Sequence, residues 1–412
     1  MRILHLTTEF PPVIYGGLGT AVGGWVSASA RAGISVAVQL VEGPLILDAN
    51  VAASAYGYGY GYGYGYGGAS RRDLRQHRSQ AHFGGQSAAR FFLSSWSNAI
   101  ERGICAVQGW RPDVVHLHTA MLWYVAEAIQ RVTGTPIVYH VHSVDRAEYE
   151  IGHEPNPWLS ESHAQDQAIA ASDRLIALTQ SEAELLVKYY PAMRAKIRAV
   201  GNGIEDNDAA RRAAFRSRPS GPPLVLYSGR LVERKGIREL LDAIPLVLDA
   251  APEAQFVLAG GPPPLTGDEV AAQWLTPQHT PYRDRIHFTG WLSPDDVYRW
   301  YAAADILVVP SRYEPFGMVV LEGMLHGLPI IAAEVGGPAD IIQQGTTGLL
   351  FPPRDVVALA AALRHLVKNG EDRSKMGIRA AHEVRRRWLW ERLVPEMIEV
   401  YRGVIQSAPV SR

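Results

Sequence analysis

The 412-residue chain is 47% hydrophobic and 20% charged, which is typical of a soluble globular protein with two or three domains. A net charge of −1 provides no overall attraction for nucleic acid, so we expect no such partner. The single cysteine, Cys105, excludes an internal disulfide framework and a multi-cysteine metal site. No apolar run approaches the roughly 20 residues of a bilayer span, and MRILHLTTEF lacks a signal-peptide cleavage pattern, so we expect a cytoplasmic protein.

Strand-like runs alternate with helical patterns in both halves of the chain, which predicts two α/β domains with parallel sheets covered by helices on both faces. The expected strands are 3–6, 35–40, 114–117, 137–141 and 175–178, then 224–227, 255–258, 286–288, 306–309, 330–332 and 349–351. The segment Asn202 to Pro223 is rich in glycine, proline and charge, which favours a linker. We therefore predict domains at 1–205 and 206–387.

A glycine-rich turn follows the first strand. Gly16, Gly17 and Gly19 come just before an expected amphipathic helix. Such a turn lets backbone N–H groups approach a phosphate closely. A plain strand-to-helix turn is the alternative.

The first domain also contains a low-complexity tract, YGYGYGYGYGYGG at 56–68, which predicts a mobile loop. The segment from Arg71 to Arg90 that follows is rich in arginine. A solvated basic loop is the ordinary interpretation, and weak contact with a membrane or an acidic acceptor is the alternative.

Two histidine pairs mark the ends of two expected strands: His116 with His118, and His140 with His142. Strand alternation places each pair on one face. Because no carboxylate cluster stands nearby at ligand spacing, we expect no metal here. His142 is the candidate for bonding a sugar hydroxyl, and the alternative for each is a core or rim histidine with satisfied hydrogen bonds.

The second half opens with a strand and a loop, SGRLVERKG, that contains Gly229, Arg230 and Lys235. Arginine offers a planar fork and lysine a point charge for phosphate oxygens. A solvated loop is the alternative.

The stretch 305–337 predicts a buried strand, a loop broken by proline, and a helix from Gly317 to Leu325. Glu314 in the loop and Glu322 in the helix then lie at the carboxyl edge of the sheet, where open α/β sheets bind ligands. The helix N-terminus suits an anion, and Glu322 suits a hydroxyl. An acidic helix start with one surface glutamate is the alternative.

These motifs together resemble the retaining GT-B glycosyltransferases of the glycogen synthase-like, family 4 group. In the second half the resemblance rests on SGRLVERKG, LAGG, the run FTGWLSP through AEVGG, and GTTGLLFPP. In the first half it rests on EFPPVIYGGLGT, RPDVVHLHT, VYHVHS and NGI. The resemblance implies two Rossmann-like domains facing across a cleft, with a C-terminal helix at about 388–408 crossing back to the first.

The resemblance also implies the roles of individual residues. His142, Arg230, Lys235 and Glu314 would be catalytic. The donor-binding residues would be Gly16, Gly17, Gly203, Gly229, Gly260, Phe316, Gly317, Met318, Val319 and Glu322. No metal and no cofactor would be required.

The implied reaction is retaining, metal-independent transfer of a hexose by a front-face mechanism. Glucose is the first expectation, moved from UDP- or ADP-glucose to a hydroxyl acceptor. Bacterial glycogen synthases usually have a lysine two residues before the paired glycines, and this chain has Ile14 there, which weighs against ADP-glucose-dependent glucan extension. A sugar-nucleotide epimerase of the same fold and a donor-binding protein without turnover are the alternatives.

Overall fold

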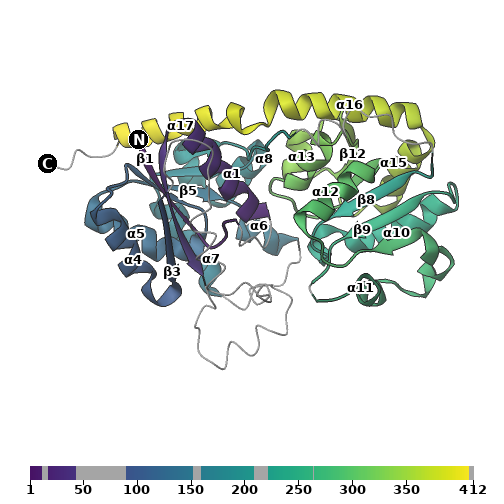
Figure 1. The fold of residues 1–412 in the computed structure, drawn as a ribbon, viewed down its shortest axis with the longest axis horizontal. Helices are drawn as coiled ribbons and strands as arrows, with labels where there is room; N and C mark the ends of the chain where they lie inside the picture. The colour runs from purple at the N-terminus through teal and green to yellow at the C-terminus, as the bar shows by residue number, and fades with distance from the viewer. Residues whose placement is uncertain (12–16, 43–89, 152–158, 208–220, 263, 408–412) are drawn as a thin grey trace.

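Two parallel sheets, each with helices packed against it, form the framework of the molecule (Figure 1). The computed structural model describes residues 1–11, 17–42, 90–151, 159–207, 221–262 and 264–407. The first sheet has seven strands in the order β3-β2-β1-β4-β5-β6-β7, and the second has six in the order β10-β9-β8-β11-β12-β13. This confirms the predicted α/β architecture.

The strands of the first sheet are β1 (Arg2–Thr7), β2 (Ser35–Glu42), β3 (Arg90–Ser95), β4 (Val114–Leu117), β5 (Ile137–Val141), β6 (Arg174–Ala177) and β7 (Ile197–Ala199). Those of the second are β8 (Leu224–Ser228), β9 (Gln255–Ala259), β10 (Ile286–Phe288), β11 (Ile306–Val309), β12 (Ile330–Ala333) and β13 (Gly348–Phe351). Central strands such as β4, β5, β11 and β12 are buried along their whole length, as expected for parallel strands covered on both faces.

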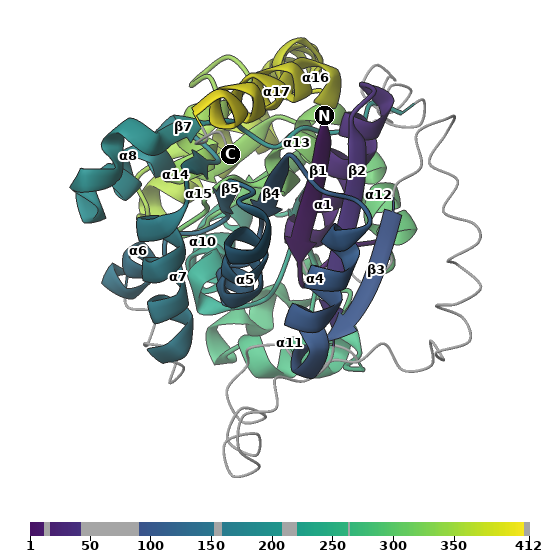
Figure 2. The same cartoon turned by 90° about the vertical axis from the view of Figure 1, so that its left-hand side faces the viewer.

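Two strands escaped the sequence analysis, β3 and β7, and both lie at edges of the first sheet (Figure 2). RFFLSS in β3 has only one buried residue, Ser94, and ends in two serines, so it lacks the continuous apolar run of a central strand. β7 has only three residues, of which two are exposed.

The first sheet is accompanied by α1 (Gly17–Arg31), α4 (Ala99–Gln108), α5 (Trp123–Thr133), α6 (Asp145–Glu150), α7 (Leu159–Ala171) and α8 (Gln180–Tyr189). The second is accompanied by α10 (Ile237–Leu248), α11 (Gly267–Trp274), α12 (Pro294–Ala303), α13 (Met318–Leu325), α14 (Gly336–Ile341), α15 (Val356–Lys368) and α16 (Gly370–Arg387). Short 3₁₀ helices occur at η1 (Trp96–Asn98), η2 (Ala120–Leu122), η3 (Pro191–Lys196), η4 (Glu233–Lys235) and η5 (Pro277–Arg285). None of the described helices combines the length and apolar character needed to cross a membrane.

The last helix, α17 (Trp390–Ser407), crosses back to the first domain (Figure 1). α16 lies along the second domain, and α17 packs on α1. Trp390 lies edge-on to Trp25 at 4.9 Å between ring centres. Gly24 is required at this crossing, because a Cβ there would lie 2.1 Å from the Trp390 ring.

Candidate active site

The two domains meet through segments that follow the carboxyl ends of their strands. After β11, the Tyr313 hydroxyl accepts a hydrogen bond from the Val144 N–H, which follows β5, at 3.0 Å. After β6, the Ser181 hydroxyl donates to Asp340 of α14 at 2.8 Å. The carboxyl ends of the strands of both sheets therefore face the same interdomain region. Open α/β sheets bind their ligands at the carboxyl ends of the strands, so this region is where a shared site is expected.

Lys235 and Glu314 form the central ion pair of this region. The Lys235 ammonium lies 2.5 Å from Glu314 Oε2, which also accepts a hydrogen bond from Ser311 Oγ at 3.0 Å. Burial alone would raise the pKa of Glu314, but Lys235 and the hydrogen bond that it donates lower the pKa below its usual value. Glu314 is thus an ionised carboxylate held in one orientation.

Arginine side chains surround this pair. Arg230 is exposed, and among the described residues its guanidinium has no ion-pair or hydrogen-bond partner. Arg234, which the sequence analysis did not select, lies 3.5 Å from Glu148 of the first domain. Arg312, also missed, is engaged by Glu239 at 2.6 Å. Arg230 is therefore the cation most available for an incoming anion. The charged run that contains Lys235 was the signal for Arg234.

Glu322 occupies a different environment from Glu314. Its Oε2 accepts a hydrogen bond from the Tyr301 hydroxyl at 2.7 Å, and burial raises the pKa of its carboxyl above the usual value. Its other oxygen remains able to accept from a ligand hydroxyl. Tyr301 lies 21 residues earlier in α12 and had no sequence signal as a site residue.

The N-terminus of α13 is shaped by Gly317, whose φ of 88° is in the left-handed region. No side chain caps this helix start. Met318 and Val319 form its first turn and are half-buried. Gly17 begins α1 on the other domain, and a Cβ on it would lie 3.6 Å from Met318. Two helix N-termini thus approach one another, and their positive ends suit an anion between them.

The ends of β8 and β9 are also built from glycine. A Cβ on Gly260 would lie 2.0 Å from the Gly229 carbonyl oxygen, so the two backbones pack directly against each other. Both residues have a φ near 150°. Because Gly229 and Gly260 have no side chains, only backbone lies at the carboxyl ends of β8 and β9, beside Arg230.

His142 belongs to the same region, because Val144, two residues later, bonds Tyr313. The imidazole is half-buried, and burial lowers its pKa to about 3, so it is neutral. His118 Nδ1 lies 3.1 Å from its Nε2. A neutral imidazole in this setting can bond a hydroxyl.

Two expected donor-binding residues have packing roles in the structure. Gly203 lies against Trp390, where a Cβ would approach the indole to 2.6 Å. The Phe316 ring is buried edge-on against Trp388 at 5.6 Å. Phe316 therefore offers the site only its backbone, and the glycine at 203 is explained by packing alone.

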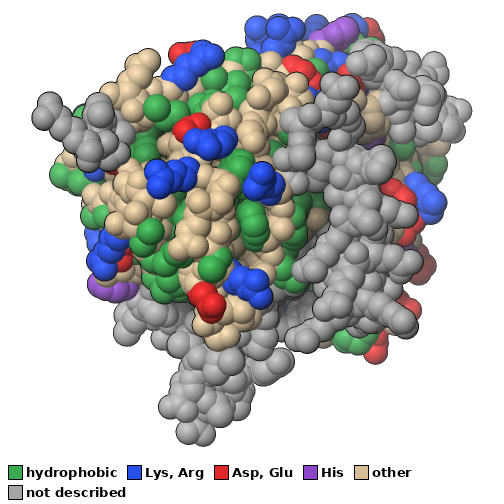
Figure 3. All heavy atoms as spheres, turned by 60° about the vertical axis from the view of Figure 1, so that its left-hand side comes forward, with side chains coloured by type: hydrophobic (Ala, Val, Ile, Leu, Met, Phe, Trp, Pro, Cys, Tyr) green, Lys and Arg blue, Asp and Glu red, His purple; other side chains and the backbone are tan. Residues whose placement is uncertain are grey.

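Several predictions fall outside the described residues. These are Gly16, Ile14, the Tyr56–Gly67 tract, the arginines at 71, 72, 75 and 78, and most of the expected linker. Arg90, at the start of β3, is described and exposed. On the face shown in Figure 3 the lysine and arginine side chains are dispersed among hydrophobic and other groups.

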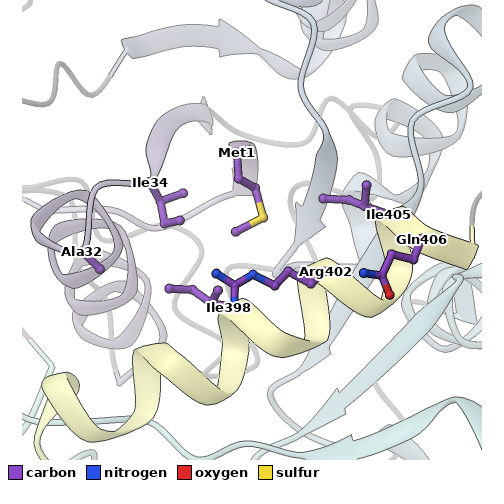
Figure 4. A pocket seen from close by; sticks show the side chains of 7 residues that line it. All are labelled: Met1, Ala32, Ile34, Ile398, Arg402, Ile405 and Gln406. Atoms are coloured by element: carbon purple, nitrogen blue, oxygen red, sulfur yellow. The ribbon is translucent and has the colours of Figure 1, made fainter.

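A hollow of about 360 Å³ lies elsewhere, between α17 and the amino ends of β1 and β2 (Figure 4). Met1, Ile34, Ile398 and Arg402 are among its lining residues. The hollow lies at the amino ends of the strands of the first sheet, whereas His142 lies at their carboxyl ends. It is therefore not part of the interdomain site.

Comparisons with known proteins identify families and chains to which this sequence is similar. Residues 15–208 match the family described as Glycosyltransferase Family 4, and residues 222–369 match Glycosyl transferases group 1. A glycogen synthase of Mycobacterium tuberculosis is 29% identical and covers 99% of this chain and 97% of the relative. A D-inositol 3-phosphate glycosyltransferase of Xylanimonas cellulosilytica is 31% identical, over 73% of this chain and 74% of the relative.

Solved structures show the same fold. A sucrose-phosphate synthase from Thermosynechococcus elongatus superposes with a TM-score of 0.74 at 21% identity, covering 98% of this chain and 99% of the other. Anabaena HepE, solved with UDP and glucose, superposes with a TM-score of 0.71 at 19% identity, covering 98% and 100%. The predicted GT-B fold is confirmed.

Proposed function

The chain belongs to the GT-B glycosyltransferases of the family 4 type, and from this premise we propose that it transfers a hexose from a nucleoside-diphosphate sugar to an acceptor hydroxyl with retention of configuration. We assign glucose as the sugar and UDP or ADP as the carrier. Relatives named glycogen synthase and sucrose-phosphate synthase support the sugar, and structural neighbours solved with UDP or ADP support the carrier.

One observation carries the proposal: an exposed Arg230 lies in the same strand-to-helix loop as Lys235, which is already paired with Glu314. A diphosphate leaving group gains negative charge as the glycosidic bond breaks. Arg230, Lys235 and the start of α13 are positioned cations and dipoles that stabilise this charge without a divalent ion. This supports transfer that is independent of added metal.

The two glutamates have separate tasks in the proposal. Glu322 accepts hydrogen bonds from the ribose, since one of its oxygens is occupied by Tyr301 and the other is available. Glu314 contacts the transferred sugar beside the backbone of Phe316 to Val319. Because Glu314 is held by Lys235 and Ser311, it is poorly disposed to act as a covalent nucleophile.

Because Glu314 is poorly disposed to act as a nucleophile, we assign a front-face mechanism, which needs no covalent intermediate with the protein. The leaving phosphate then helps to deprotonate the acceptor hydroxyl, and the acceptor attacks on the face from which the diphosphate departs. His142, as a neutral imidazole, bonds an outer hydroxyl of the donor sugar. The approach of the two domains displaces water and limits hydrolysis of the donor.

The test is a panel of nucleoside-diphosphate sugars offered with and without sugar acceptors. Nucleoside diphosphate release is measured with and without added Mg²⁺. Mass spectrometry gives the mass of the product, and NMR gives its anomeric configuration. We expect acceptor-dependent release, an α-linked product from an α-linked donor, and no dependence on added Mg²⁺. An inverted product, an epimerised nucleotide sugar, or donor binding without turnover would contradict the proposal.

A further inference from the structure

Five histidines from three neighbouring strands form one buried cluster in the first domain. His5 of β1 is in register with His116 of β4, and His118, His140 and His142 continue the same face at the ends of β4 and β5. The His116 and His118 ring centres are 4.1 Å apart, and those of His140 and His142 are 4.5 Å apart. The sequence analysis expected two separate pairs and did not include His5.

Hydrogen bonds connect part of this cluster. His5 Nδ1 lies 3.0 Å from His118 Nε2, and His118 Nδ1 lies 3.1 Å from His142 Nε2. His116 Nδ1 lies 2.6 Å from the hydroxyl of Tyr401 in α17. These contacts engage both nitrogens of His118 and one nitrogen each of His5, His116 and His142, and they set the orientation of the rings.

Other nitrogens of the cluster are buried and have no protein partner among the described residues. They are Nε2 of His5, Nε2 of His116, and both ring nitrogens of His140. His5, His116 and His140 are 0% exposed. A buried polar atom that forms no hydrogen bond carries a desolvation penalty, so several such atoms in one place indicate a missing ligand.

The chemistry of these groups matches a transition-metal ion. One nitrogen from each of His5, His116 and His118 lies within 4.8 Å of the others. A tetrahedral zinc ion with Zn–N bonds of about 2.0–2.1 Å holds its ligand nitrogens about 3.3 Å apart, so the three rings draw closer together when the ion binds. All three side chains are buried, which disfavours a charged imidazole, and the neutral imidazole is the form that ligates a metal ion.

We propose that His5, His116 and His118 bind one divalent transition-metal ion of the zinc class inside the first domain. The contacts of the other ring nitrogens fit this assignment, because a metal-ligating histidine is commonly oriented by a hydrogen bond at its second nitrogen. Tyr401 supplies that bond to His116, and His142 supplies it to His118, whose Nε2 exchanges its contact with His5 for the ion. The ion joins β1 to β4 and, through His118, orients His142.

A second set, formed by His118, His140 and His142, has the same spacing. We favour the first set because its three residues are buried, whereas His142 is only half-buried at the interdomain site. The metal site goes beyond the proposed function and does not depend on it. Its three ligands are buried inside the first domain, so the ion takes no direct part in glycosyl transfer.

The experiment uses the full chain without a polyhistidine tag, refolded in the presence of Zn²⁺ and dialysed against metal-free buffer. Elemental analysis by mass spectrometry should find about one zinc per wild-type chain. Replacement of Zn²⁺ by Co²⁺ should produce the strong visible absorption of tetrahedral cobalt–imidazole coordination. Zinc-loaded protein should also melt at a higher temperature than the metal-free form.

His116→Leu and His5→Leu should each lower the bound zinc at least tenfold. His140→Leu and the exposed-strand variant His287→Gln serve as controls and should retain it. Failure of the wild type to bind zinc would overturn the proposal, as would zinc loss in His140→Leu with retention in both ligand variants. If one ligand variant does not fold, the other still decides the outcome, and the Co²⁺ spectrum of the wild type is independent of both.

Discussion

At the residue scale, Arg230 and Lys235 differ in what their removal costs. Arg230→Ala should lower kcat by 10²- to 10³-fold, a loss of about 2–4 kcal/mol of transition-state stabilisation, with an unchanged melting temperature because the side chain is exposed. Lys235→Ala should lower kcat similarly and also destabilise the fold, because it leaves Glu314 unpaired. With 18% of the Lys235 side chain exposed, we expect about 2–3 kcal/mol of destabilisation, below the value for a fully buried pair.

Steady-state kinetics and thermal melts of both variants check this prediction. Arg299→Ala is a suitable control, since it removes an exposed arginine from α12. Near wild-type turnover in Arg230→Ala would contradict the assignment of Arg230 to the diphosphate site. An unchanged melting temperature in Lys235→Ala would show that its ion pair does not stabilise the fold.

A second residue-scale prediction separates the two glutamates. Contacts of Glu322 with ribose hydroxyls should be similar in the ground state and the transition state, so Glu322→Gln should raise KM more than it lowers kcat. Glu314, beside the sugar, should act mainly on kcat when changed to Gln. Kinetics at saturating acceptor, with donor binding measured by calorimetry, distinguish the two. Untouched donor affinity with abolished turnover in Glu322→Gln would refute the ribose assignment.

At the element scale, the contact between α8 and the loop before α13 should make stability depend on pH. Glu182, in the first turn of α8, is 1% exposed and accepts a hydrogen bond from Tyr313 at 2.7 Å. Burial raises its pKa from 4.5 to about 8. Between these values the folded state holds a proton that the unfolded state has lost. Glu182 therefore makes the free energy of unfolding fall as pH rises, by about 1.4 kcal/mol per unit.

Glu182→Gln should remove that slope and make the protein more stable than the wild type near the upper end of this range. Urea unfolding across the interval from pH 4.5 to about 8 measures the effect. Glu184→Gln, an exposed change in the same helix, should leave the slope unaltered. Parallel curves for wild type and Glu182→Gln would contradict the prediction.

At the scale of the whole molecule, one hydrophobic cluster runs through both domains. It includes Val38 and Val138 of the first sheet, Leu226 and Val309 of the second, and Trp388 between α16 and α17. Because the cluster is continuous, the domains should unfold together. Calorimetry of the wild type should show a single transition, with equal calorimetric and van't Hoff enthalpies.

Trp388→Ala should uncouple the domains. Its ring is 8% exposed and packs on Phe316, so its loss should cost about 3–5 kcal/mol and separate the transitions. Trp291→Ala, at a side chain with 46% exposure, is the control and should melt in one step. Two transitions in the wild type would show that the shared cluster does not couple the domains.

The sequence by itself determined the local elements and the fold class. Buried parallel strands appear as short apolar runs whatever surrounds them, so β4, β5 and β11 match their predicted bounds in full. The position of Glu314 before a helix that follows β11 was equally local. β3 and β7 were missed because edge strands do not need a continuous apolar run.

Only the tertiary structure decided which of these side chains meet. Lys235 and Glu314 are 79 residues apart, and His5 and His118 are 113 apart. Strand alternation tells which face a side chain occupies, but its neighbour depends on strand order and register. The pairing of β1 with β4 placed His5 in the histidine cluster, and the docking of two domains set Tyr313 against Glu182. Such contacts arise from packing between distant segments, and no periodicity within one segment records them.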